Sequence, residues 1–150
     1  MTTQSLHLGL PDPVLKPEFY DGILIKRGLA WVIDALIVLL FCIVALPFTA
    51  FLAIFVFPLL MVSVGFVYRW ITLAGRSSTW GMRMTGIEIR DRDGLRLQSG
   101  TALAHVSIYS FSILVAPMQL ISVIMMLFTD RRQGLSDLFL GTAALNRPAD

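Results

Sequence analysis

Long apolar stretches alternate with short polar ones along this chain of 150 residues. Between Gly28 and Tyr68 the only charged side chain is Asp34, and residues 101–128 contain no Asp, Glu, Lys or Arg. A helix of about 20 apolar residues crosses the hydrocarbon core of a bilayer, so both stretches are long enough to span a membrane. The pattern predicts an all-α membrane protein, a small helical bundle with two full spans and a third apolar segment.

The first stretch is too long for one crossing. As a single helix, residues 35–68 would measure about 51 Å, against a hydrocarbon core of about 30 Å. Pro47 is the expected turn, because proline disrupts the interior of a helix. We therefore expect a first span over 25–46 and a second over 49–70, in which Pro58 would introduce a kink.

The third segment, at 101–128, allows two structures. As one helix it would measure about 42 Å, which a tilted span can accommodate. Alternatively, it breaks at Pro117 into a helical hairpin that returns to the side where it started. In that case residues 141–145 would lie beside the loop that precedes the segment and add a strand to it.

Basic residues distinguish the two structures, because they concentrate on the cytoplasmic side of membrane proteins. They lie before the first span and in the loop 71–100, whereas the turn at Pro47 has none. We therefore expect a multi-pass protein of the cell inner (plasma) membrane with its amino terminus and this loop in the cytoplasm. We favour the broken segment, because it returns Arg131 and Arg132, in the tail 129–150, to the cytoplasmic side.

The loop 71–100 is predicted to form a small β-hairpin at the membrane interface. Apolar and polar residues alternate at 87–90 and at 95–98, and Asp93-Gly94 between them is a strong turn signal. Upstream of Gly86 the apolar positions shift by one residue, which a β-bulge would explain.

Composition limits the class of protein. Hydrophobic residues make up 56% and charged residues 15% of the chain, and the mean hydropathy is +0.75, which is more apolar than typical soluble domains. The net charge of +2 is too small to indicate nucleic-acid binding, and the lone Cys42 cannot form a disulfide within the chain. The lipid bilayer is therefore the expected partner of a membrane domain over 23–147, which follows a disordered cytoplasmic tail over 1–22.

The candidate functional or pairing residues are charged groups close to the apolar segments. A carboxylate such as Asp34 costs roughly 2.5–3.5 kcal/mol in the middle of a membrane helix, so it requires a partner or a function. Arg27 lies on the same face but about 10 Å away along the helix, too far for direct pairing. Asp137, just beyond the third segment, is the expected partner of Arg27. Aromatic residues around an arginine predict interface anchors at Tyr68, Arg69 and Trp70.

Other chemistries have little support in the sequence. His105 is expected at the membrane interface, and no second His or Cys lies at the spacing of a metal site. No nucleophile motif or glycine-rich oxyanion loop accompanies Ser136 and Asp137. We therefore expect no enzyme activity, no metal and no cofactor.

Three motifs resemble those of the RDD family of membrane proteins. They are Tyr20-Asp21-Gly22 with Arg27-Gly28-Leu29-Ala30 and Ile33-Asp34, then Thr79-Trp80-Gly81-Met82-Arg83-Met84-Thr85-Gly86-Ile87 with Asp91-Arg92-Asp93-Gly94, and finally Gln133-Gly134-Leu135-Ser136-Asp137 with Gly141-Thr142. The resemblance covers about 20–147 and matches Arg27, Asp34 and Asp137 to the arginine and the two aspartates of the family name. Trp80 stands where the family usually has proline, and Ser136 where it often has histidine.

The resemblance implies two alternative functions. In some members the domain organises partner membrane proteins, which implies an accessory or scaffold role within a homo-oligomer or a larger membrane complex. For others sodium/proton exchange has been proposed, and Asp34 would then be the exchange carboxylate of an oligomer whose path is lined by Ser107, Ser110 and Ser112. We favour the scaffold, because a conducting path needs polar residues across the membrane and the second span offers only Thr49 and Ser63.

Overall fold

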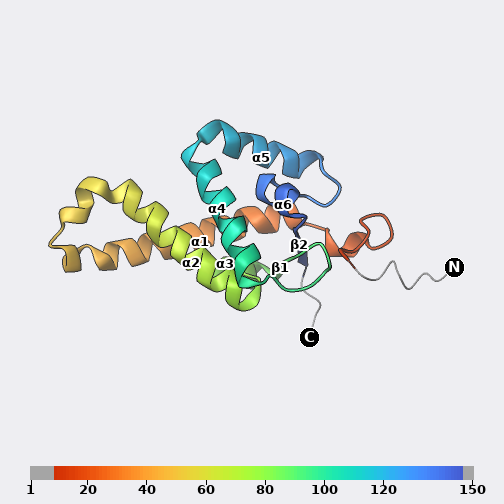
Figure 1. The fold of residues 1–150 in the computed structure, drawn as a ribbon, viewed down its shortest axis with the longest axis horizontal. Helices are drawn as coiled ribbons and strands as arrows, with labels where there is room; N and C mark the ends of the chain where they lie inside the picture. The colour runs from red at the N-terminus through yellow and green to blue at the C-terminus, as the bar shows by residue number, and fades with distance from the viewer. Residues whose placement is uncertain (1–8, 147–150) are drawn as a thin grey trace.

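The computed structural model describes residues 9–146 and shows a mostly helical chain (Figure 1). Helix α1 (Ile23–Ala45) and helix α2 (Phe57–Arg76) form a hairpin that projects from the rest of the molecule. Two short 3-10 turns, Pro47–Thr49 and Leu52–Val56, connect them. Both helices are long and apolar enough to cross a membrane, so the two predicted spans and the turn at Pro47 are confirmed.

The second span differs in detail from its prediction. Helix α2 begins at Phe57 and continues to Arg76 rather than covering 49–70. Pro58 lies in the first turn of α2. Backbone N–H groups in a first turn have no acceptor within the helix, so proline, which has no N–H, fits there without a kink. The predicted kink at Pro58 is therefore wrong.

A short helix and a strand follow α2. Helix α3 (Trp80–Thr85) begins after Thr79, whose hydroxyl accepts a hydrogen bond from the backbone N–H of Met82. It ends at Gly86, where φ is +77°, a conformation that glycine adopts readily. Strand β1 (Ile87–Arg90) comes next. The predicted β-bulge is wrong, because the shift of the apolar positions at Gly86 marks a change from helix to strand.

The small sheet pairs β1 with the end of the chain. Strand β2 (Ala143–Asn146) is antiparallel to β1, with Ile87 opposite Asn146 and Arg90 opposite Ala143. This pairing confirms the added strand that was expected from residues 141–145.

The predicted second strand of the hairpin is absent from the described residues, although the turn at Asp93-Gly94 forms. Residues 95–98 contribute only a single bridge between Arg96 and Arg90. Ser77 explains why pairing stops there: its carbonyl accepts the N–H of Ile89, and its hydroxyl accepts the N–H of Leu97. Ser77 therefore accepts the two backbone N–H groups that a longer hairpin would use to pair its own strands.

The third apolar segment is broken, as favoured above. Helix α4 (Ser99–Leu114) and helix α5 (Ala116–Phe128) meet at an angle of 118°. The bend lies at Val115, and Pro117 lies in the first turn of α5 instead of interrupting a helix. Helix α6 (Leu135–Leu140) then packs against α4, and β2 returns to β1 (Figure 1). The chain thus ends on the side from which α4 started.

The segment before α1 is ordered in part. Residues Pro17–Phe19 form a 3-10 turn, and Tyr20 is buried with its hydroxyl donating to the carbonyl of Pro11 at 2.7 Å. The predicted disorder is therefore wrong around Tyr20, while residues 1–8 lie outside the described part of the chain.

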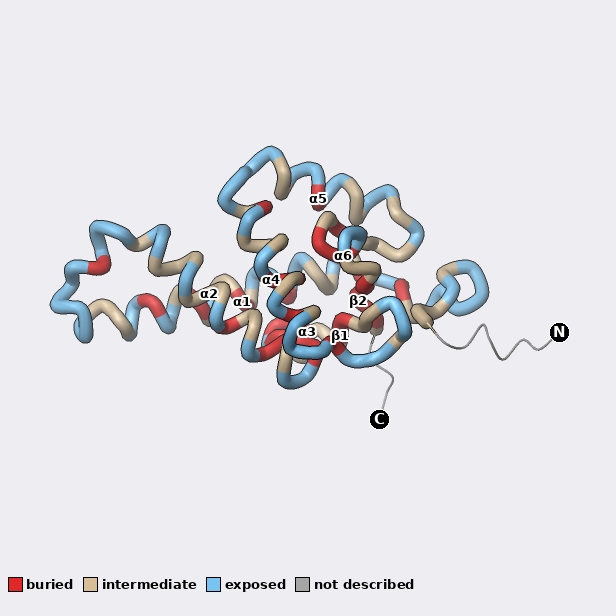
Figure 2. The backbone as a smooth tube through the Cα atoms, viewed as in Figure 1, coloured by how far each residue is buried: buried red, intermediate tan, exposed pale blue. Residues whose placement is uncertain are grey.

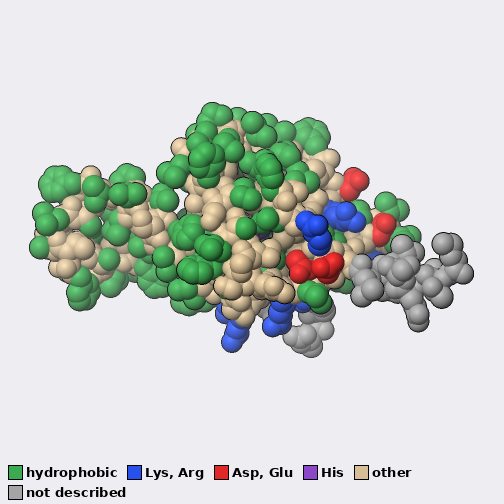
Figure 3. Space-filling model, in the orientation of Figure 1, with side chains coloured by type: hydrophobic (Ala, Val, Ile, Leu, Met, Phe, Trp, Pro, Cys, Tyr) green, Lys and Arg blue, Asp and Glu red, His purple; other side chains and the backbone are tan. Residues whose placement is uncertain are grey.

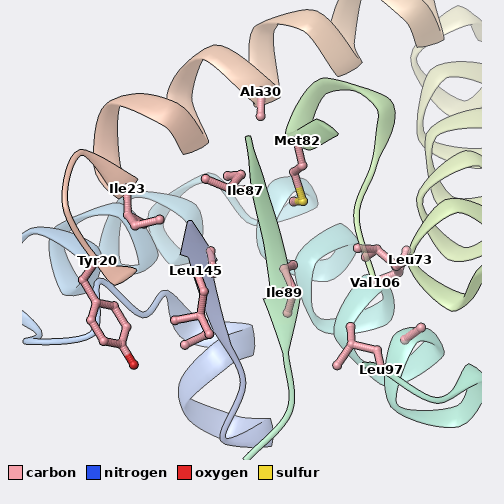
Figure 4. Close-up of a cluster of buried hydrophobic side chains, with 13 residues drawn as sticks. Tyr20, Ile23, Ala30, Leu73, Met82, Ile87, Ile89, Leu97, Val106 and Leu145 are labelled. Atoms are coloured by element: carbon pink, nitrogen blue, oxygen red, sulfur yellow. The ribbon is translucent and has the colours of Figure 1, made fainter. Parts of the chain in front are cut away.

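Burial is concentrated at the sheet end of the molecule (Figure 2). The core there packs α1 and α4 against the sheet, with Ile23, Ile87, Ile89 and Val106 fully buried (Figure 4). The projecting hairpin instead exposes large apolar side chains, such as Phe48 at 86%. In the view of Figure 3 the charged side chains gather near the sheet, and the hairpin presents apolar ones. This separation is that of a helical hairpin surrounded by lipid.

The arrangement predicts which positions share a side of the membrane. In a Cys42→Ala background, Asp93→Cys and Asp130→Cys should react alike with an impermeant thiol reagent, and Phe48→Cys should react from the opposite side. The reason is that β2 returns to β1, whereas Phe48 lies at the tip of the hairpin. Labelling of intact and opened cells measures this. Reaction of Asp130→Cys together with Phe48→Cys would contradict the return of the chain.

Candidate functional site

Asp34 lies inside the protein, where donors from other segments surround its carboxylate. It is 2% exposed. Its Oδ1 accepts hydrogen bonds from the Tyr68 hydroxyl at 2.7 Å and from the Gly81 backbone N–H at 2.9 Å. Its Oδ2 accepts the Thr79 hydroxyl at 2.6 Å. The carboxylate thus joins α1 to α2 and to the start of α3.

Arg69 supplies the positive charge nearest to Asp34. Its Nη2 lies 3.9 Å from Asp34 Oδ2, longer than a hydrogen bond, and its guanidinium lies 4.1 Å from the centre of the Tyr109 ring. Tyr109 also accepts a hydrogen bond from Trp31 Nε1 at 2.7 Å. Through these contacts the Asp34 site reaches α4 as well.

The three predicted interface anchors have contacts within the protein. Tyr68 is buried with its hydroxyl on Asp34, and Arg69 faces the interior beside it. Trp70 is partly buried and donates to the carbonyl of Ser99 at 3.4 Å. Because α2 continues to Arg76, Tyr68 and Arg69 lie within the helix and not at its end, and their role as interface anchors stays a prediction.

Trp80 adds to the packing around Tyr68. Its backbone N–H donates to the Tyr68 hydroxyl at 3.2 Å, and the two rings meet edge to face at 5.8 Å. Phe41 of α1 packs against both rings. A proline at position 80 has no N–H for this bond. In this chain the tryptophan therefore supports the hydroxyl that binds Asp34.

Gly81 allows α3 to approach α1 closely. A Cβ atom at this position would lie 2.3 Å from the carbonyl oxygen of Ala30 and 2.8 Å from Asp34 Oδ1. Only glycine, which has no Cβ, can bring its backbone N–H to the carboxylate here.

Asp137 is the second buried carboxylate, with 0% exposure. Arg27 Nη1 donates to its Oδ2 at 2.8 Å, which is the pairing expected from the sequence. His105 Nε2 lies 2.9 Å from Oδ1, which also accepts the Thr142 hydroxyl at 2.7 Å. The backbone N–H of Gly134 donates to Oδ2 at 3.2 Å. These bonds attach α6 to α1, to α4 and to the residue before β2.

The charges around Asp137 set its ionisation. Burial by itself would raise the pKa of this carboxyl, but Arg27, His105 and the Thr142 hydroxyl together hold the pKa well below its usual range. Asp137 is therefore a carboxylate at neutral pH.

His105 is a residue whose place the sequence did not reveal. It was expected at the membrane interface, but it is 4% exposed and lies between Asp137 and Ser136, whose Oγ is 3.3 Å from its Nε2. Thr79 and Thr142 were likewise not singled out as ligands of the carboxylates. Each lies within a glycine-containing motif, Thr79 two residues before Gly81 and Thr142 directly after Gly141, and that position was the available signal.

The two carboxylates form separate sites. Arg27 and Asp34 do not pair with each other; each has partners of its own, as their spacing on α1 required. Within residues 9–146 no group of three or more His, Cys, Asp and Glu side chains is arranged to hold a metal ion.

Comparison with known protein families gives one match for this chain. The model of the RDD family matches residues 22–141, which include both carboxylates and most of their partners. No curated protein and no solved structure matches the chain at a significant level.

The close approach at Gly81 predicts a large effect of a single methyl group. Gly81→Ala should destabilise the protein by about 1–3 kcal/mol, because α3 must move away from the Ala30 carbonyl and from Asp34. The control is Gly75→Ala in α2, where nothing lies within 4 Å and alanine favours the helix by up to about 1 kcal/mol. Thermal unfolding in detergent compares the two. Equal stability of both variants would contradict the geometry.

Proposed function

The chain belongs to the RDD family and is a multi-pass membrane protein, and we propose that it is an accessory or scaffold protein of a membrane complex, without catalytic activity. The observation that carries the proposal is the set of donors that the chain itself places on Asp34. Its carboxylate accepts three hydrogen bonds from its own chain and lies beside Arg69. A carboxylate held in this way stabilises the bundle, and a cation would have to compete with these donors and with the Arg69 charge to bind it.

The projecting hairpin supports the same proposal. Between Asp34 and Tyr68 the hydroxyl side chains are Thr49 and Ser63, and both donate to carbonyls of their own segment. Among the described residues, no continuous series of polar side chains therefore leads from Asp34 to the tip of the hairpin. The exposed apolar side chains of the hairpin suit lipid or the helices of a partner, in a homo-oligomer or a larger complex.

The orientation in the membrane is part of the proposal. We assign the sheet end to the cytoplasmic side of the inner (plasma) membrane, with the amino terminus on the same side. The support is the distribution of basic residues: Lys16 lies before α1, Lys26 and Arg27 lie in its first turns, four arginines lie between α2 and α4, and the turn at Pro47 has none.

A cation/proton antiporter is the second candidate function. The observation in its favour is that Asp34 borders two cavities, of about 190 and 520 Å³, which share Trp31, Arg69 and Tyr109 among their lining residues. Of the serines proposed to line a path, Ser110 borders the smaller cavity and Ser112 the larger one. Ser107 instead donates to the Leu103 carbonyl. Further copies of the chain would have to complete such a pathway.

Flux measurements distinguish the two functions. We expect purified protein in vesicles to show negligible cation-driven proton flux, with no difference between the unaltered chain and Asp34→Asn. The matched control is Asp93→Asn, which neutralises an exposed carboxylate in the turn after β1. Flux that is abolished by Asp34→Asn and retained by Asp93→Asn would overturn the scaffold and support exchange.

A further inference from the structure

We propose that the cavity between α1, α4 and α5 binds the anionic head group of an amphiphilic molecule, whose hydrocarbon chain leaves toward the lipid between α1 and α5. The site does not depend on the scaffold role and would exist in either of the functions considered above.

The cavity has the size of a ligand site. Its volume is about 520 Å³, within the range of about 300–1,000 Å³ typical of small-molecule pockets. Most of its wall is apolar, and a few polar groups converge on it. Such walls favour a ligand that is itself partly apolar.

The polar wall carries one carboxylate, Asp34, whose oxygens accept three hydrogen bonds from the chain itself, and several donors. The Arg69 guanidinium has five N–H groups, and in residues 9–146 none of them forms a hydrogen bond. The three donors already on Asp34 hold its oxygens, so Arg69 stays 3.9 Å away. Gln119 accepts the Ser112 hydroxyl through Oε1, which leaves its amide N–H groups without a partner in the described chain. The Tyr109 hydroxyl accepts from Trp31 and retains its own proton to donate.

These donors specify the charge of the ligand head group. A guanidinium in an apolar wall binds carboxylate or phosphate through strong, charge-assisted hydrogen bonds. Gln119 and Tyr109 can donate further bonds to the same oxygens. A neutral head group accepts the Arg69 hydrogen bonds only without charge assistance, and a cationic one is repelled by the guanidinium.

The mouth of the cavity specifies the rest of the ligand. Three apolar residues of the cavity wall are nearly half exposed, and we place the mouth at them: Trp31 at 48%, Val123 at 40% and Leu127 at 46%. Helix α5 packs mainly against α4 and α6. Since α1 is a candidate membrane span, this mouth faces acyl chains rather than water. An inorganic anion would have to cross that layer, whereas an amphiphile can leave its chain within it.

Fluorescence quenching tests the site directly. Trp70→Phe and Trp80→Phe leave Trp31, at the mouth, as the single tryptophan. The protein is purified in detergent and titrated at pH 8 with dibromostearate or with its methyl ester, which share the brominated chain and differ in the head charge. We expect the anion to quench Trp31 at about tenfold lower mole fraction than the ester, a ratio typical of one charge-assisted contact. Equal quenching by both would overturn the proposal.

Matched variants separate binding from folding. Arg69→Gln should remove the preference for the anion, and Arg76→Gln, an exposed arginine two turns further along α2, should keep it. Gln119→Leu should weaken the preference for the anion without altering the surroundings of Asp34. If Arg69→Gln does not fold, the result for Gln119→Leu decides whether the site exists. Val123→Phe should obstruct the mouth and reduce quenching by both probes. A preference that survives Arg69→Gln, or that is unchanged in Gln119→Leu where that variant decides, contradicts the site.

Inorganic phosphate distinguishes an amphiphile from a free anion. At millimolar concentration it should leave the quenching by dibromostearate unchanged. Displacement of the probe by phosphate would show a site for a soluble anion and overturn the assignment to an amphiphile.

Discussion

The structure depends on a carboxylate that lies inside a membrane helix and requires donors. Asp34 sits where lipid cannot satisfy it, so the chain must fold polar groups onto α1. Tyr68 brings α2, and Thr79 and Gly81 bring the beginning of α3. The requirement explains why α3 approaches α1 so closely that position 81 has no room for a side chain. One buried charge thus determines how three segments meet.

Asp137 imposes the same requirement at the other end of the chain. It draws Arg27 of α1 and His105 of α4 onto α6, and the bond from Thr142 places the chain for β2 to pair with β1. The bent pair of helices α4 and α5 permits this return. Beside these carboxylates, Arg69 lies near Asp34 and over the Tyr109 ring, and Gln119 accepts the Ser112 hydroxyl.

Sequence reasoning recovered the features that follow from strong local rules. A charge-free stretch too long for one span requires a turn, and Pro47 marked it; the spacing of Arg27 and Asp34 excluded their direct pairing. Tertiary context decided the rest. Tyr68 resembled an interface anchor because the end of α2 at Arg76 could not be read from hydropathy, and a lone histidine such as His105 carries no pattern that reveals its partner. The helix before Gly86 was missed because six residues are too few to show helical periodicity.

A double-mutant cycle between Asp34→Ala and Tyr68→Phe tests most directly whether the Asp34 carboxylate holds the segments together. Unfolding free energies of the unaltered chain, both single variants and the double variant are measured in detergent. If the Tyr68 hydroxyl stabilises the buried carboxylate, the two changes should couple by about 1.5–3 kcal/mol, the strength of a hydrogen bond to a charged group. Single effects that add to within about 0.5 kcal/mol would contradict a carboxylate that organises the fold.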